Sequence, residues 1–285
     1  MDLRENYIQT NGVRLHVMES GQADGPVVLF LHGFPEFWYA WRKQLPFFAQ
    51  KDFFAVAPDQ RGYNLSDKPE GIASYGINEL AKDIAGLIDA YGRKQVYLVG
   101  HDWGASVAWW VAIRYPELIK KLVILNVPHP KVMARNVFKN TEQMKRSWYI
   151  FFFQIPGAVE KLAAETDYEW VLEMIKTSAN SGAFTPAELE EYRKAFKKPG
   201  AFTAMVNWYR AMIQTKQEAP ADFDVSMPML LMWGEEDISM LSQMADESMA
   251  YCKQGKLIKM PGVSHWIQHE QAEKVNSLIE EFITK

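Results

Sequence analysis

The sequence predicts an α/β protein with a mostly parallel sheet that helices flank, and with a helical lid inserted into it. Three observations support this fold class. Six short, nearly all-apolar runs recur along the chain, as expected of strands buried on both faces of a sheet. Helical patterns lie between these runs. One stretch, residues 130–222, interrupts the alternation and contains no convincing buried strand.

The strands are expected as one antiparallel hairpin followed by the six apolar runs. In YIQTNGVRLHVMES, apolar and polar residues alternate around Asn11-Gly12, a dipeptide that accepts the positive φ angles of a tight turn. The apolar runs are VVLFLHG from Val27, FFAVAP from Phe53, VYLVG from Val96, LVILN from Leu122, MLLMWG from Met229 and KLIKM from Lys256.

Helices are predicted where apolar residues recur at three- and four-residue spacing. One such pattern covers residues 80–88 and ends at Gly92. Another helix contains residues 105–115 and ends before Pro116, because proline has no backbone N–H to donate. Residues 272–282 carry the apolar stripe of a C-terminal helix.

The stretch 130–222 is rich in aromatic residues, and Pro156-Gly157, Ser181-Gly182 and Pro199-Gly200 separate its helical patterns. We interpret it as a helical cap inserted between the sixth and seventh main strands. The predicted division is a core domain of residues 1–129 and 223–285 and a cap domain of residues 130–222.

Composition and charge exclude several classes of protein. The 285 residues are 48% hydrophobic and 23% charged, which is typical of a globular chain rather than a disordered or fibrous one. A net charge of −4 without a long run of one sign argues against nucleic acid as a partner. No stretch approaches the roughly 18 consecutive apolar residues of a membrane span, and the aromatic run 148–153 is too short. No membrane partner is therefore expected.

A cytoplasmic location is expected from two features. Cys252 is the single cysteine, so no internal disulfide can form, as is typical of a reducing compartment. The first ten residues lack the apolar stretch of a secretory signal. The sequence leaves the oligomeric state open.

The most informative segment is VYLVGHDWGASVAWW, in which a buried strand passes directly into a helix at residues 100–104. This is the layout of a nucleophile elbow, with small residues at 100 and 104 for the sharp turn and Asp102 at its centre. A carboxylate that attacks a saturated carbon forms an ester that water can cleave. The elbow thus predicts displacement at carbon through a covalent intermediate. The alternative, that Asp102 is only a helix N-cap, remains open at this point.

Two downstream residues complete a predicted catalytic triad. Asp237 lies just after the strand MLLMWG, and His265 lies in the loop after the last strand. Nucleophile, acid and histidine then follow in the chain order 102, 237, 265, which is the order expected with an elbow of this kind. All three lie at carboxyl ends of strands, where α/β sheets build their sites. His265 is expected to activate water, and Asp237 to orient it.

The strand from Val27 ends in His32-Gly33-Phe34-Pro35. The backbone N–H groups of Phe34 and Trp103 are predicted to form an oxyanion hole, and Gly33 lets the backbone come close. His32 and Pro35 are expected to shape the loop. No set of histidines and carboxylates has the spacing of metal ligands, so neither a metal nor another cofactor is expected.

Four segments give the chain a resemblance to the epoxide hydrolases of α/β-hydrolase fold. They are HGFPEFWYAWR at 32–42, DQRGYNLSDKP at 59–69, GHDWGA at 100–105 and NVPHP at 126–130. The similarity covers nearly the whole chain, cap included. It implies that Asp102 opens an oxirane, that water then releases a vicinal diol, and that a small-molecule epoxide and water are the reactants.

The resemblance also implies an acid for the epoxide oxygen, which in this family is a pair of cap tyrosines. The segments RSWYIFFFQIPG and MVNWYRAM are similar to those that carry the pair, which points to Tyr149 and Tyr209. A phenol suits this role because its usual pKa of about 10 leaves it protonated at neutral pH. Candidates for an apolar substrate pocket are Trp38, Phe138, Phe152, Phe153 and Trp208.

Two alternative functions stay open. A haloalkane dehalogenase shares the aspartate elbow, and the Trp103 indole could donate to a leaving halide. That family, however, usually has Asn where this chain has Phe34, and it does not need the tyrosine pair. A non-catalytic small-molecule binder on the same scaffold has no need of Asp102, Asp237 and His265 together.

Overall fold

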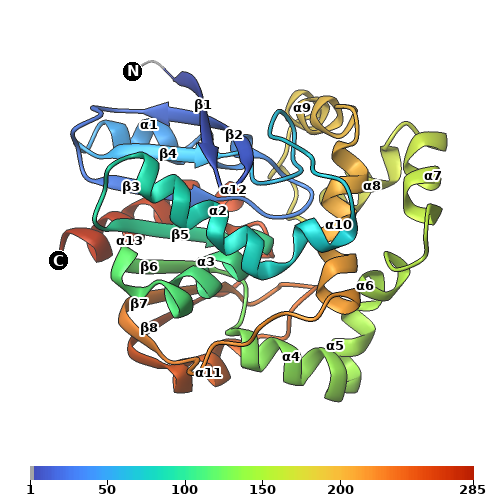
Figure 1. Cartoon of the computed structure of the whole chain (residues 1–285). Helices are drawn as coiled ribbons and strands as arrows, with labels where there is room; N and C mark the ends of the chain where they lie inside the picture. Colours follow the sequence, from blue (N-terminus) through green and yellow to red (C-terminus); the bar gives the residue numbers. More distant parts are fainter. Residues whose placement is uncertain (1–2) are drawn as a thin grey trace.

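The computed structural model describes residues 3–285, and among them eight strands form a single sheet (Figure 1). The spatial order is β1-β2-β4-β3-β5-β6-β7-β8. The strands are β1 (Arg4–Thr10), β2 (Val13–Ser20), β3 (Val27–Leu31), β4 (Phe54–Pro58), β5 (Val96–His101), β6 (Ile119–Leu125), β7 (Val225–Gly234) and β8 (Cys252–Met260).

The predicted hairpin and the parallel sheet are both confirmed. β1 pairs with β2 from Arg4↔Glu19 to Thr10↔Val13, and the turn residues Asn11 and Gly12 have φ angles of 40° and 76°. β2 is also antiparallel to β4, whereas every pairing from β4 to β8 is parallel. The last two strands, β7 and β8, each begin four residues earlier than the apolar runs suggested, because exposed polar positions there also join the ladder.

Helices cover both faces of the sheet, and successive residues within a strand pack into two different hydrophobic cores. In β3, Val27, Leu29 and Leu31 pack with residues of α2 and α3, whereas Val28 and Phe30 pack with residues of α1 and α13. This alternation explains why the run is apolar at every position. The helices that accompany the sheet are α1 (Gln44–Ala49), α2 (Ile77–Ala90), α3 (Trp103–Arg114), α11 (Gln243–Ser248), α12 (Ile267–Glu270) and α13 (Ala272–Thr284), with 3₁₀ helices at Trp38–Trp41, Ile72–Tyr75, Pro116–Leu118 and Met249–Tyr251.

Between β6 and β7 the chain forms helices only, and these lie to one side of the sheet in Figure 1. They are α4 (Pro130–Lys139), α5 (Thr141–Arg146), α6 (Trp148–Phe152), α7 (Ala158–Glu165), α8 (Glu169–Ser178), α9 (Pro186–Phe196) and α10 (Ala201–Gln214). Thr185 caps α9 in a capping box with Glu188, and Pro186 occupies the first helical position.

No helix between residues 3 and 285 is both long enough and apolar enough to cross a bilayer.

Candidate active site

Asp102 lies at a sharp turn between β5 and α3. Its φ and ψ angles of 49° and −124° are unusual for a residue other than glycine. A Cβ atom added at Gly100 would lie 2.5 Å from the carbonyl oxygen of Gly104, and one added at Gly104 would lie 2.1 Å from that of Leu31. The turn is therefore possible only with glycine at both positions. Asp102 makes no capping hydrogen bond to α3, so its side chain does not act as an N-cap.

We expect Gly104→Ala to destabilise the protein by about 3 kcal/mol or more, the upper end of the usual cost of overpacking, because backbone on β3 cannot move aside. The control is Gly182→Ala, at an open position with a φ angle of 84°, where only the left-handed backbone costs about 1–2 kcal/mol. Urea unfolding of both variants measures the difference. Equal losses of stability would mean that the elbow tolerates a side chain.

The three predicted triad residues lie together. The Nδ1 atom of His265 is 2.7 Å from Oδ2 of Asp237, and its Nε2 atom is 3.6 Å from Oδ2 of Asp102. Asp237 is fixed in turn, because its Oδ1 atom accepts hydrogen bonds from the backbone N–H groups of Ser239 and Met240, at 2.7 and 3.0 Å. The histidine thus bridges two carboxylates, one held rigidly and one at the elbow.

The charges of this group shift the three pKa values. Burial alone would lower the pKa of His265, but the neighbouring Asp237 and Asp102 outweigh burial and raise it to about 10. Burial alone would raise the pKa of each carboxyl group, but the hydrogen bond and charge of His265 outweigh it and hold the pKa values of both Asp102 and Asp237 below the usual range. At neutral pH, a protonated His265 therefore stands between two carboxylates.

The loop after β3 closes over the elbow. The backbone N–H of Phe34 donates to Oδ1 of Asp102 at 2.6 Å. A Cβ atom added at Gly33 would lie 2.3 Å from the Cβ atom of Asp102, so only glycine permits this approach. Trp103 is the first residue of α3, where backbone N–H groups lack partners within the helix. Both predicted oxyanion donors thus belong to segments that adjoin the carboxylate.

Both cap tyrosines line the same cavity as Asp102, a space of about 290 Å³ with mainly apolar walls. Tyr149 comes from α6 and Tyr209 from α10, and their ring centroids are 5.9 Å apart at 81°. The Tyr209 ring also packs against Phe34 and Trp103, each at 5.1 Å. Burial, and then the charge of Asp102, raises the pKa of both phenols well above the usual value. Both hydroxyl groups are therefore protonated at neutral pH.

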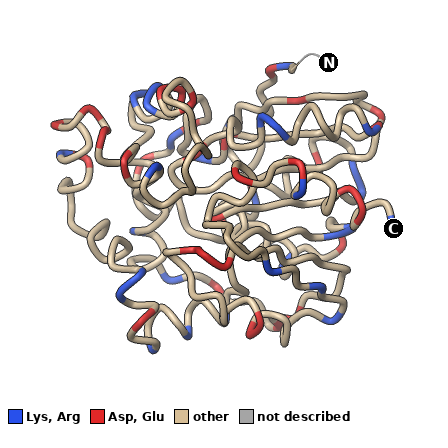
Figure 2. The backbone as a smooth tube through the Cα atoms, turned by 180° about the vertical axis from the view of Figure 1, so that it is seen from behind, with Lys and Arg blue, Asp and Glu red and all other residues tan. Residues whose placement is uncertain are grey.

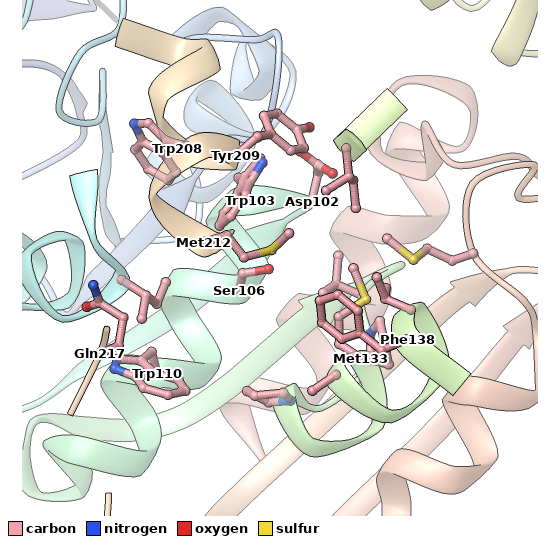
Figure 3. A pocket seen from close by; sticks show the side chains of 18 of the residues that line it. Asp102, Trp103, Ser106, Trp110, Met133, Phe138, Trp208, Tyr209, Met212 and Gln217 are labelled. Carbon is pink, nitrogen blue, oxygen red and sulfur yellow. The ribbon is translucent and has the colours of Figure 1, made fainter. Parts of the chain in front are cut away.

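The five predicted pocket residues divide into two groups. Phe138 and Trp208 line the cavity (Figure 3). Trp38, Phe152 and Phe153 are not among the residues that line it. Phe153 instead supports the wall from behind, because its buried ring contacts Phe34 and Tyr209.

Several cavity residues escaped the sequence analysis. Figure 3 shows Ser106, Trp110, Met133, Met212 and Gln217 around the space that Asp102 faces. The cavity residues of α3 could have been identified from the sequence, because positions 103, 106 and 110 have the three- and four-residue spacing of one helix face. For the residues of the cap, the sequence offered no comparable signal.

Asn126 and His101 support the triad and were not identified from the sequence as doing so. Asn126, with a φ angle of 54°, donates from Nδ2 to Oδ2 of Asp237 at 2.7 Å and accepts from the Gly234 N–H at 2.9 Å. His101 donates from Nε2 to the carbonyl oxygen of His265 at 2.9 Å. These three bonds fix backbone or side-chain positions around His265.

An aspartate elbow, a downstream carboxylate and a histidine on the carboxyl ends of a mostly parallel sheet are the arrangement of an α/β hydrolase. Residues 26–272 match the family model described as alpha/beta hydrolase fold, and the chain belongs to that family.

Relatives within the family include several epoxide hydrolases. Epoxide hydrolase 1 of Caenorhabditis elegans is 40% identical over 98% of this chain and 70% of its own length. The AB hydrolase superfamily protein YfhM of Bacillus subtilis is 42% identical over 97% of this chain and 96% of its own length. A solved Bacillus megaterium epoxide hydrolase, in complex with an inhibitor, superposes with a TM-score of 0.90 at 33% identity, covering 98% of this chain and 100% of that chain. The present chain is thus a member of the epoxide hydrolases.

Proposed function

We propose that the protein hydrolyses small-molecule epoxides to vicinal diols, with water as the second reactant. The observation that carries the proposal is that one cavity contains Asp102 together with Tyr149 and Tyr209. A carboxylate nucleophile and two neutral acids are what the opening of an oxirane requires, because the carbon is attacked while the oxygen gains a proton.

In the first step, the Asp102 oxygen that Phe34 does not hold attacks a ring carbon, and the carbon–oxygen bond of the oxirane breaks. Tyr149 and Tyr209 hydrogen-bond the oxygen, and one of them gives it a proton. The products are an alkyl ester of Asp102 with a free hydroxyl group, and one tyrosinate.

Esterification then prepares His265 for the second step. The ester carries no charge, so one of the two carboxylates that raise the pKa of His265 to about 10 is lost. His265 can then release its proton, which restores the tyrosine. As a neutral imidazole it takes a proton from water while the water oxygen attacks the ester carbonyl carbon.

The oxyanion of the tetrahedral intermediate is stabilised by the backbone N–H groups of Phe34 and Trp103. Collapse of the intermediate breaks the bond from the carbonyl carbon to the substrate-bearing oxygen, and this oxygen takes the proton of the newly added hydroxyl group. The diol is thereby released, with Asp102 ionised and His265 protonated, as at the start. Asp237 keeps the imidazole oriented through its 2.7 Å hydrogen bond.

We also propose that residues 130–222 act as a cap domain on a core of residues 1–129 and 223–285. In support, this segment supplies both tyrosines, whereas Asp102, Asp237 and His265 come from the strand ends. A cytoplasmic location is a further proposal. It rests on the single cysteine, Cys252, whose pKa burial raises to about 12 so that the thiol stays protonated.

The decisive test is the trapping of the ester. We expect His265→Gln, incubated with styrene oxide, to gain the mass of one substrate molecule, because the ester forms but water is not activated. The double variant Asp102→Ala/His265→Gln is the matched control and should stay unmodified. Intact-mass spectrometry measures both proteins.

Three results discriminate between the functions considered. An unmodified mass for His265→Gln would contradict the ester mechanism. Bromide release from a brominated alkane, without diol formation from styrene oxide by the unchanged protein, would instead indicate a dehalogenase. The absence of both products would indicate a binding protein.

A further inference from the structure

Helices α5 and α6 and the turn after them carry exposed apolar side chains that the proposed reaction does not use. Met144, Trp148, Phe151 and Ile155 are 41%, 61%, 42% and 51% exposed. The spacings of four and three residues place Met144, Trp148 and Phe151 on one helix face, and Ile155 follows four residues later, in the bend after α6. The hydrogen bonds from Ser147 N to Gln143 O and from Ile150 N to Ser147 O carry the helical path from α5 into α6. We call these four side chains the apolar stripe.

The opposite face of the same helices is the one that packs onto the protein. Gln143, Ser147, Ile150 and Phe153, which again follow at helical spacing, are all buried. The apolar stripe therefore faces away from the core, and no other described part of the chain covers it. Contiguous exposed apolar side chains of this kind mark interaction surfaces.

The charge around the apolar stripe has the opposite sign to that of the whole chain. Residues 131–155 contain five basic residues and a single acid, Glu142, whereas the chain has a net charge of −4. In Figure 2, the charged positions along α4 and α5, at the lower left, are mostly blue. Lys139 and Lys145 are exposed and form no ion pair with any residue from 3 to 285. Their charges are therefore available to a partner.

This charge pattern discriminates between the possible occupants. A second copy of the chain in a two-fold contact would place the same basic segment opposite itself, which is repulsive. An anionic lipid surface is complementary, since tryptophan, phenylalanine and isoleucine on one face with lysine and arginine beside them are typical of segments that lie in the bilayer interface. We propose that the apolar stripe, with Lys139 and Lys145, binds the surface of an anionic bilayer.

The proposed contact lies at the membrane surface and is not a membrane span, since no helix between residues 3 and 285 is long and apolar enough to cross a bilayer. Binding at this surface also places the cavity near lipid. Phe138, on α4 next to α5, lines the cavity and is 55% exposed, so the cavity wall reaches the outside close to the apolar stripe. An apolar epoxide dissolved in the bilayer would then enter nearby. That consequence rests on the proposed function, whereas the binding itself does not.

The test is flotation of the full-length protein with vesicles. We expect the protein to float with vesicles of phosphatidylcholine and phosphatidylglycerol in equal parts, and not with phosphatidylcholine alone, with the binding lost at high salt. Lys139→Glu with Lys145→Glu should lower the partition coefficient about thirtyfold or more, given the usual contribution of each basic residue at such a surface. Trp148→Ser with Phe151→Ser should also abolish flotation.

Matched controls change lysines and an exposed aromatic residue elsewhere. Lys94→Glu with Lys274→Glu alters the net charge equally at exposed positions outside the cap, and Tyr7→Ser removes an exposed ring on β1. Both controls should float like the unchanged protein. Failure of the unchanged protein to float, or equal losses in the controls, would overturn the proposal. A dimer that is detected by sedimentation and that Trp148→Ser with Phe151→Ser dissociates would also overturn the proposal. Hydrolysis of dissolved styrene oxide by Lys139→Glu/Lys145→Glu is measured separately, so failure of lipid binding is distinguishable from failure of the proposed function.

Discussion

Asp102→Ala is expected to lower the turnover of styrene oxide by about 10⁶-fold, the scale of loss when a covalent nucleophile is removed. The cavity and the tyrosine pair remain in this variant, but no group is left to form the ester. Asp102→Asn is the closer control for shape, because it keeps the size of the side chain and removes the charge. Diol formation measured by chromatography, with melting temperatures to verify folding, tests both variants. Undiminished turnover in either would mean that another group, or water directly, opens the ring.

Oxygen labelling tests the same assignment without changing the protein. The oxygen that the diol acquires in the first turnover comes from Asp102, since water attacks the carbonyl carbon and not the substrate. We therefore expect a single-turnover reaction in ¹⁸O-labelled water to give largely unlabelled diol, and the label to enter the protein. Diol that carries the label after one turnover would contradict a covalent intermediate.

The fold could be predicted because its signals are local and repeated. Each inner strand is a short apolar run, and β3 shows why, since its alternate residues enter two separate cores. Asn11-Gly12 forms a turn and Pro116 ends a helix, because the backbone restrictions of these residues act within a few positions. The starts of β7 and β8 were missed because the strands begin with exposed polar residues, Ser226, Lys253 and Gln254, and because the register between the two strands shifts there.

The proximity of the three predicted triad residues could be foreseen for a topological reason. The carboxyl ends of parallel strands meet at one edge of the sheet, so residues 102, 237 and 265 had to come close once the strands were known. The support from Asn126 was not predictable in this way, because it depends on a positive φ angle and on a side-chain orientation.

The cap was harder to predict in detail. Tyr149 and Tyr209 were identified by resemblance, whereas periodicity gave no reason to prefer them to Phe152 or Phe153. On α6, successive aromatic residues point in different directions, so a one-residue step decides between the cavity, the interior and the solvent. The orientation of α6 depends on contacts such as that of Gln143 with Ser147 and with the carbonyl oxygen of Ser239. A pattern of residue types does not contain that information.

Tyr149→Phe combined with Tyr209→Phe is expected to slow ring opening by at least about 10³-fold, within the range that positioned acids contribute. Without the hydroxyl groups, the leaving oxygen would depart as an unprotonated alkoxide in a mainly apolar cavity. Each single variant should keep part of the activity, because one phenol can still donate. Rapid-mixing measurement of ester formation isolates this step from hydrolysis.

Tyr63→Phe is the matched control, because Tyr63 is also buried near the site but its hydroxyl has no hydrogen-bond partner among residues 3–285 and it does not line the cavity. It should react at nearly the unchanged rate. The pH dependence gives a second reading, since burial raises the pKa of Tyr149 and Tyr209 above the usual value of about 10. Loss of the tyrosine proton should therefore not slow ring opening between pH 7 and about pH 10. A fully active double variant would show that the acid lies elsewhere. A decline in the ester-formation rate within that range that a single variant abolishes would show that the tyrosine titrates without the raised pKa.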